Sequence, residues 1–169
     1  AKISCQFSVK IQSTVSEYLG CEFFKSTDPG KLWIGQPKLI SSLAALMEQE
    51  GSAKKSSLPA VPRHILRRAT DTDQLLDGTS HRLYRQLVGK LLYLTTKTRP
   101  DIANAVRDLT KHLDAPMEEH LAACWKVSNF VQATKDTYLQ IQPTTVDPDL
   151  KAYCDSDFSG DPDTRRSVT

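Results

Sequence analysis

Apolar residues recur along this chain with two different periodicities, which distinguish expected strands from expected helices. Near the N-terminus they alternate with polar residues from Ile3 to Ile11, which is typical of a half-buried strand. Tyr18 to Phe24 is a second expected strand. The sequence Asp28-Pro29-Gly30 is a strong turn signal, and Lys31 to Gly35 supplies the returning strand. The pattern therefore predicts an antiparallel β-hairpin.

From Gln36 to Gln49 the apolar residues follow helical spacing, with Pro37 suited to the first turn of a helix. The next stretch, from Gly51 to about Ser80, is rich in Ser, Pro, Lys and Arg and has no sustained period. We expect it to be a linker or an extended strap. Its positive charge has two possible purposes, contact with backbone phosphate or simple solubility, and the sequence leaves both open.

Three further helices are expected in the second half of the chain. Arg82 to Leu94 has a broad apolar face, and Ser80 is placed to cap this helix. A short break at Thr95 to Thr98 separates it from a helix after Arg99-Pro100, and a third follows Ala115-Pro116. Because the connections are short, the three helices are expected to form a small antiparallel bundle.

Short strands are expected at Tyr138 to Gln142 and at Leu150 to Cys154. The predicted fold class is therefore α+β, with an N-terminal antiparallel hairpin, a central three-helix bundle and short C-terminal strands. The expected divisions of the chain fall at 1–36, 37–80, 81–136 and 137–169.

Length and composition permit one real hydrophobic core, because the chain has 169 residues of which 39% are hydrophobic. No apolar run approaches the roughly 20 residues that span a bilayer, and no signal peptide is recognisable. We expect an intracellular protein, cytoplasmic or nuclear, without a membrane partner. The 4 cysteines lack zinc-ligand spacing, so reduced thiols are expected.

The formal charge of +2 conceals an asymmetry. Between Lys54 and Lys111 there are 12 basic residues against 5 aspartates, a net charge of +7. This basic region is a candidate footprint for phosphate. Charge alone favours a solvated basic surface, and only the helix that contains Gly89 reverses this preference.

One residue on the solvent side of the Arg82 to Leu94 helix is unusual. At 100° per residue, Gly89 falls opposite the apolar face, together with Arg82, Gln86 and Tyr93. A glycine in a helix interior costs roughly 1 kcal/mol against alanine. Its presence suggests that another surface approaches the backbone there. A glycine that packs against a neighbouring helix is the alternative, and the pattern alone does not decide between them.

Three segments of the sequence resemble segments of a known protein family. The sequence from Tyr84 to Leu94, followed by Thr98 to Ala103, closely resembles the thumb of copia-type retrotransposon reverse transcriptases. Tyr18 to Glu22, with Leu32 to Gln36, resembles the hairpin that grips the primer end. Tyr153 to Ser167 is similar to the opening of the copia-type RNase H domain. The three segments stand in the family's order.

The resemblance implies a set of nucleic-acid contacts on the thumb helix and the hairpin. Arg85 and Lys90 would meet phosphates, and Gln86 and Tyr93 would touch sugars or base edges. The partner would be an RNA/DNA hybrid or a DNA duplex, together with the rest of a polyprotein. The whole implied set is Tyr18, Leu19, Gly20, Arg82, Arg85, Gln86, Gly89, Lys90, Tyr93 and Arg99.

The resemblance also implies one catalytic carboxylate. Asp155 directly follows the last expected strand, as the first Mg²⁺-binding Asp of RNase H does. Asp157 is a weaker candidate. Arg166 argues against a calcium loop, because it stands where that loop needs Glu. The other RNase H carboxylates would lie beyond Thr169, and the chain contains no adjacent Asp-Asp for polymerase chemistry. We therefore expect Mg²⁺ in the parent enzyme and none bound by this segment.

The resulting prediction is a segment of an RNA-directed DNA polymerase that binds a template-primer duplex and is catalytically incomplete alone. Two alternatives remain open. One is a domesticated nucleic-acid-binding module without catalysis, and the other is a helical module whose exposed glycine face binds another protein.

Overall fold

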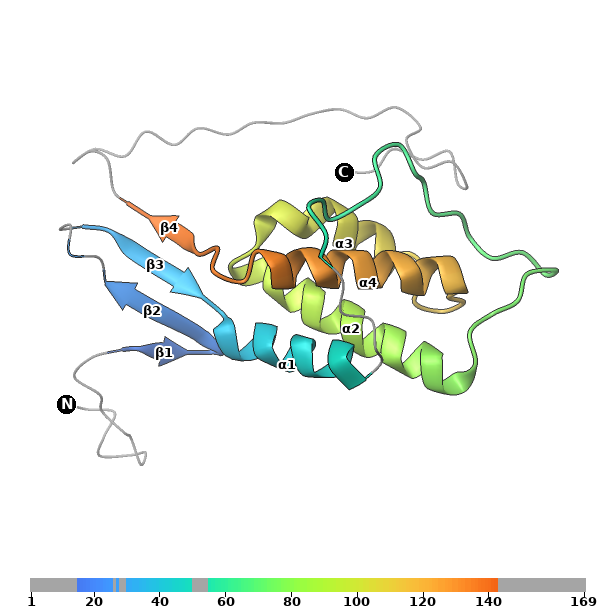
Figure 1. Ribbon diagram of the computed structural model, residues 1–169, viewed down its shortest axis with the longest axis horizontal. Coiled ribbons are helices and arrows are strands. Elements are labelled where there is room, and N and C mark those ends of the chain that lie inside the picture. The colour runs from blue at the N-terminus through green and yellow to red at the C-terminus, as the bar shows by residue number, and fades with distance from the viewer. Residues whose placement is uncertain (1–14, 26, 28–29, 50–54, 143–169) are drawn as a thin grey trace, which may run out of the picture.

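A computed structural model of the chain describes residues 15–25, 27, 30–49 and 55–142. Within these ranges a four-stranded antiparallel sheet lies at one end of a group of four α-helices (Figure 1). The predicted α+β class is confirmed. The expected strands at Ile3 to Ile11 and Leu150 to Cys154 lie outside the described residues.

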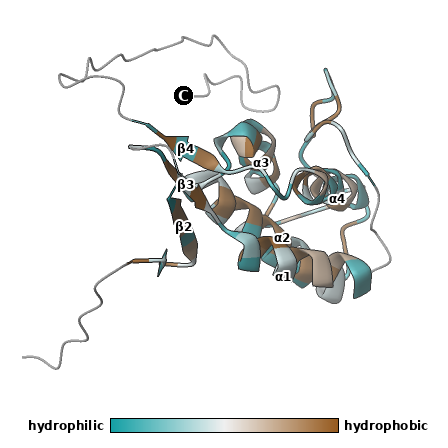
Figure 2. Ribbon diagram, turned by 60° about the vertical axis from the view of Figure 1, so that its left-hand side comes forward, coloured by the Kyte–Doolittle hydropathy of each residue, from teal (hydrophilic) through white to brown (hydrophobic). Residues whose placement is uncertain are grey.

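The sheet combines strands from both ends of the described chain, in the order β1-β2-β3-β4. The predicted β2–β3 hairpin is confirmed, with Phe24 opposite Trp33. Trp33 also lies opposite Gln140 of the last strand, so the chain returns to this sheet after its helices. Both central strands carry hydrophobic residues over much of their length (Figure 2). The strands are β1 Glu17–Tyr18, β2 Cys21–Lys25, β3 Leu32–Gly35 and β4 Leu139–Ile141.

The prediction that Tyr18 to Phe24 is one strand is wrong, because the chain reverses inside it. Leu19 and Gly20 have φ angles of 49° and 70°, and Tyr18 pairs with Cys21 across the turn. Two central residues with positive φ define the tight hairpin turn that matches the twist of its strands. The Tyr18-Leu19-Gly20 segment is therefore the tip of a second hairpin.

Within the described ranges, four α-helices surround one core, so the expected bundle of three helices is not confirmed. The first helix, predicted correctly, contributes Ile40, Leu43 and Met47 to the same buried cluster as the other three. Its apolar stripe needs a partner, and the bundle supplies one. The helices are α1 Pro37–Gln49, α2 Gly78–Lys97, α3 Ala103–Thr110 and α4 Glu118–Ala133, with a 3₁₀ turn at Pro100–Ile102 before α3.

The long helix α2 is fixed at its start and along its buried side. Asp77, rather than the predicted Ser80, is the N-cap, because its carboxylate accepts bonds from the backbone N–H groups of Thr79 and Ser80 at 2.7 and 2.9 Å. These bonds hold the pKa of Asp77 below its usual value. On the buried side, the Tyr84 hydroxyl donates to the Leu109 carbonyl at 2.8 Å and ties α2 to α3.

Residues 55–77, here called the strap, connect α1 to α2 by crossing α4 (Figure 1). The Leu76 N–H donates to the Pro116 carbonyl at 2.9 Å. The Met117 N–H donates to Nδ1 of His120, so Nε2 of that ring carries the proton and donates to the Arg67 carbonyl at 2.9 Å. The predicted strap is thus tied to the start of α4.

No helix within the described ranges is both long enough and apolar enough to cross a membrane.

His120 is buried and stacks on His112, with ring centroids 3.9 Å apart. Burial lowers the pKa of His120 below its usual value, although the Arg67 carbonyl and the Glu119 carboxylate act in the opposite direction. The neutral ring is the form that the fold stabilises.

A lowered pKa in the folded state makes stability depend on pH. The contribution of neutral His120 is complete above its unfolded pKa of about 6.5 and is lost as the pH falls below that value, by at most about 1.4 kcal/mol per pH unit. Urea unfolding should therefore show a lower free energy of unfolding at pH 5.5 than at pH 7.5. His120→Asn keeps an acceptor for the Met117 N–H and should flatten this dependence. The exposed His64, changed to Asn, is the control; equal pH dependence in both variants would contradict the assignment.

Candidate nucleic-acid interface

The outward face of α2 is open, as the glycine pattern requires. Arg82, Arg85, Gln86 and Gly89 are exposed. A Cβ atom built on Gly89 would meet nothing within 4 Å. The alternative in which this glycine makes room for a neighbouring helix is therefore excluded within the described chain. Gly89 therefore leaves the backbone exposed to solvent in the middle of α2.

The charge on α2 is of one sign. From Gly78 to Lys97 the helix contains Arg82, Arg85, Lys90 and Lys97 and no acidic residue. No carboxylate of the described residues lies within ion-pair distance of these four side chains. The helix therefore presents uncompensated positive charge, the type of surface that attracts phosphate.

Two basic residues outside α2, Arg67 and Lys111, differ from these four because each lies against an aspartate. Arg67 of the strap contacts Asp73 at 2.6 Å, and Lys111 contacts Asp108 at 3.1 Å. Arg67 and Thr70 together hold the pKa of Asp73 far below its usual value. The net charge of the basic region is thus concentrated on α2 rather than spread over the strap.

The two lysines of α2 lie at the flanks of the open face. Lys90 donates from Nζ to Oγ of Ser42 in α1 at 2.9 Å. Nζ of Lys97 stands 5.9 Å from the centroid of the Tyr93 ring. The Lys90 ammonium is half-buried and bonded to α1, whereas Lys97 and the two arginines are exposed.

The β1–β2 turn meets α2 at Tyr93. The Tyr93 hydroxyl donates to the Leu19 carbonyl at 2.6 Å, across 74 positions of sequence. Tyr18 and Leu19 are 64% and 61% exposed. Two groups that the sequence placed on separate elements therefore share one surface, which we call the α2–turn surface. It consists of Tyr18, Leu19, Gly20, Arg82, Arg85, Gln86, Gly89, Lys90 and Tyr93.

A second contact, which no sequence pattern predicts, holds the same hairpin against α1. Glu17 and Glu22 lie directly opposite each other in the β1–β2 pair. Like charges in that position repel. Lys38, in the first turn of α1, contacts Glu17 and lies 3.9 Å from Glu22, and the hydrogen bond to Glu17 raises its pKa. The lysine bridges the two carboxylates.

Arg99 does not belong to this surface, which corrects the prediction. Its side chain is 1% exposed and makes two bonds to Asp101, at 2.9 and 2.8 Å. It also donates to Oγ1 and to the backbone carbonyl of Thr134, at 2.7 and 3.2 Å. Arg99 thereby joins the turn after α2 to the end of α4, and its guanidinium holds the pKa of Asp101 below the usual value.

Asp155 and Asp157 lie outside the described residues, so the Mg²⁺-binding role of Asp155 stays a prediction. Within the described part of the chain, no group of three or more His, Cys, Asp or Glu side chains could hold a metal ion. The two cysteines described, Cys21 and Cys124, are free thiols.

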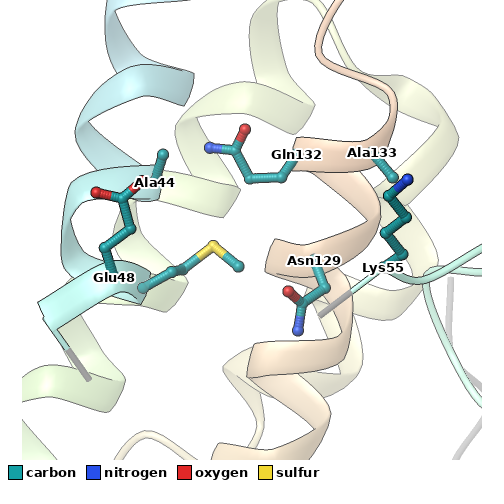
Figure 3. Close-up of a pocket in the computed structure, with 7 residues that line it drawn as sticks. Ala44, Glu48, Lys55, Asn129, Gln132 and Ala133 are labelled. Carbon is teal, nitrogen blue, oxygen red and sulfur yellow. The ribbon is translucent and has the colours of Figure 1, made fainter. Parts of the chain in front are cut away.

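A hollow of about 320 Å³ lies between α1 and α4 (Figure 3). None of the residues predicted to bind nucleic acid lines it. Its lining residues are Ala44, Met47, Glu48, Lys55, Asn129, Gln132 and Ala133. The candidate site is therefore an exposed surface and not this pocket.

Known proteins similar to this chain include large transposon products. A retrovirus-related Pol polyprotein from transposon TNT 1-94 of Nicotiana tabacum is 29% identical over 168 residues, which is 99% of this chain and 12% of that protein. A retrovirus-related Pol polyprotein from transposon RE1 of Arabidopsis thaliana is 33% identical over 161 residues, 95% of this chain and 10% of that protein. The chain spans about a tenth of the length of these relatives.

Shorter relatives are also found. An uncharacterised mitochondrial protein of Arabidopsis thaliana is 29% identical over 171 aligned positions, covering 99% of this chain and 66% of that protein. No family model matches the chain. No solved structure matches it either.

The assignment of Arg99 to the core can be tested by stability. Arg99→Lys keeps the charge but cannot reproduce the two-pronged contact with Asp101 and the bonds to Thr134. Its free energy of unfolding in urea should fall by about 2–3 kcal/mol. The matched control is Arg85→Lys on the exposed face of α2, which should change stability by no more than about 0.5 kcal/mol. Equal effects of the two substitutions would show that Arg99 is not structural.

Proposed function

We propose that the α2–turn surface of this chain binds the template-primer duplex of a reverse transcriptase. The chain's homologues include retrovirus-related Pol polyproteins from copia-type transposons of plants. The observation that carries the proposal is the bare backbone at Gly89, exposed on a helix that has four basic residues and no acidic one. A negatively charged partner that comes close to the helix backbone would fit both the exposed glycine and the positive charge.

A duplex groove supplies such a partner. The minor groove of A-like and hybrid duplexes is wide and shallow, so a helix can cover it. With a rise of about 1.5 Å per residue, the basic residues from Arg82 to Lys97 extend over about 22 Å of helix. Gly89 lies near the middle of this span. A side chain at that position would hold the sugars away from the helix, whereas glycine lets them approach.

The residues of the surface suit binding without sequence preference. Arg82 and Arg85 offer charged donors to phosphates, which set position but carry no sequence information. Gln86 can reach base edges, but readout in the minor groove is degenerate. At the other end, the exposed turn at Tyr18 and Leu19 is proposed to lie against the end of the primer strand.

In the parent polyprotein, this segment is proposed to hold the duplex while other parts carry out RNA-directed DNA synthesis and cleavage of the RNA strand. The two-metal chemistry of both reactions needs Mg²⁺ and carboxylates. Asp155 is the one residue of this chain that we propose as such a ligand. Alone, the chain is proposed to bind duplex without catalysing either reaction.

A protein partner is the second candidate function. Besides Tyr18 and Leu19, the exposed Leu92 and Tyr93 are 44% and 38% accessible, and such side chains also suit a protein interface. The absence of acidic residues on α2 favours a nucleic acid. Duplex binding by the chain separates the two candidates.

Substitution of Gly89 separates binding from folding. Because a Cβ there meets open space, Gly89→Ala should raise the free energy of unfolding by up to about 1 kcal/mol through better helix propensity. The same change should weaken binding to a labelled RNA/DNA hybrid, and Gly89→Val should weaken it by tenfold or more, or about 1.4 kcal/mol. Ala122→Val, at an exposed position of α4, is the control. If both glycine variants bind the hybrid with wild-type affinity, Gly89 is not part of the interface.

Salt dependence tests the charged part of the surface. The logarithm of the association constant should fall linearly with the logarithm of salt concentration, with a slope of about −0.9 per phosphate neutralised. Arg85→Ala should make this slope less steep by about 1. Arg107→Ala, on the exposed side of α3, should leave the slope unchanged. Wild-type binding that is indifferent to salt would contradict the electrostatic role of α2.

A further inference from the structure

We propose that Tyr93 is a positioning residue whose hydroxyl holds the Leu19–Gly20 turn, so that the Leu19 side chain is presented beside the open face of α2. This inference rests on the proposed duplex-binding function and assigns Tyr93 a different role from direct contact through its hydroxyl.

Leu19 is an unfavourable residue for its position. At a φ angle of 49° it lies in the left-handed region, which few residues other than glycine, asparagine and aspartate occupy. The first central position of this turn type is dominated by those three residues. Leu19 is also 61% exposed, so burial of its side chain does not offset the strain. Backbone strain that burial does not explain is a mark of a contact site.

Tyr93 provides a bond that stabilises the strained turn. Its hydroxyl donates to the carbonyl of Leu19 itself, at 2.6 Å. Lys97 lies over the ring of Tyr93, and the positive charge of Lys97 also acts on Cys21 at the far side of the turn. Tyr93 and Lys97, one turn of α2 apart, thus both face the hairpin tip.

Within the described ranges, the bond between Tyr93 and Leu19 is the hydrogen bond that joins the turn to α2, and Cys21, directly after the turn, is buried. Among the described residues, the buried cluster of the helical core includes no side chain from the sheet. The hairpin is held at its open end by Lys38 of α1, which contacts Glu17. At its tip it is held by the bond between Tyr93 and Leu19. The orientation of the tip relative to α2 therefore depends on the Tyr93 hydroxyl.

The consequence is a division of roles within the α2–turn surface. The hydroxyl of Tyr93 is committed to a backbone carbonyl, so the groups that this end presents to a sugar or base are the apolar side chain of Leu19 and the ring of Tyr18. Tyr93 fixes where these groups stand relative to Gly89.

Tyr93→Phe removes the bond and keeps the ring. In the free protein, hydrogen exchange of the amides in residues 15–25 should become faster. In titrations of a labelled RNA/DNA hybrid, affinity should fall about three- to tenfold, the range expected for loss of one hydrogen bond. The salt slope should be unchanged, because no charge is lost. Tyr138→Phe, in the loop before β4, removes a hydroxyl elsewhere and should leave exchange in 15–25 and affinity at the wild-type values.

Leu19→Asn provides a second test, because asparagine accepts the left-handed conformation. This variant should unfold at a higher urea concentration than the wild type and yet bind the hybrid more weakly, since the apolar contact is gone. With Asn at this position, Tyr93→Phe should change exchange in the turn less than it does in the wild-type background.

The outcomes distinguish the inference from the function on which it rests. If wild-type protein binds the hybrid with the expected salt dependence but Tyr93→Phe binds equally well, the positioning role is overturned and the proposed function stands. If Leu19→Asn binds as tightly as the wild type, Leu19 is not a contact. If wild-type protein does not bind the hybrid, the proposed function fails, and the positioning role fails with it.

Discussion

The structure depends on the division of α2 into two faces with opposite requirements. On one face Tyr84, Leu87 and Leu91 are fully buried and hold the helix against α1, α3 and α4. The other face is left with a bare backbone at Gly89 and with positive charge that no acidic residue of the helix offsets. A glycine in an exposed helix would weaken an isolated helix, but here the buried face and the Asp77 cap stabilise it. The core therefore makes the open face possible.

The sheet is attached to this bundle by polar contacts rather than by a shared core. Lys38 lies between two opposed glutamates at one end of the first hairpin, and Tyr93 holds the strained turn at the other. Such contacts specify orientation through geometry and leave the exposed tip accessible. The α2–turn surface is thus a composite, with a rigid helical part and a part whose position is set by a few bonds.

The sequence predicted the elements that follow from periodicity and left open those that depend on tertiary contacts. All four helices and the β2–β3 hairpin have clear apolar patterns. Ser80 and Asp77 are both good caps three positions apart, and only the structure shows which carboxylate or hydroxyl faces the helix end. No pattern shows that α1 docks on the bundle, or that a leucine adopts positive φ. Asp101, two positions after Arg99, is close enough in sequence to indicate an ion pair between the two side chains. The family resemblance instead predicts that Arg99 is exposed and binds nucleic acid.

The proposed function requires that the open face of α2 lies along a paired nucleic acid, with Gly89 at the contact. The most direct measurement is an NMR titration of the isotope-labelled chain with an RNA/DNA hybrid, followed through the backbone amide signals. We expect the largest shifts to centre on Gly89 and its neighbours Gln86 and Tyr93 and to extend to Leu19 and Gly20, with the strap and α4 little changed. Shifts centred on the strap or on the hollow between α1 and α4, with Gly89 unmoved, would contradict the proposed function.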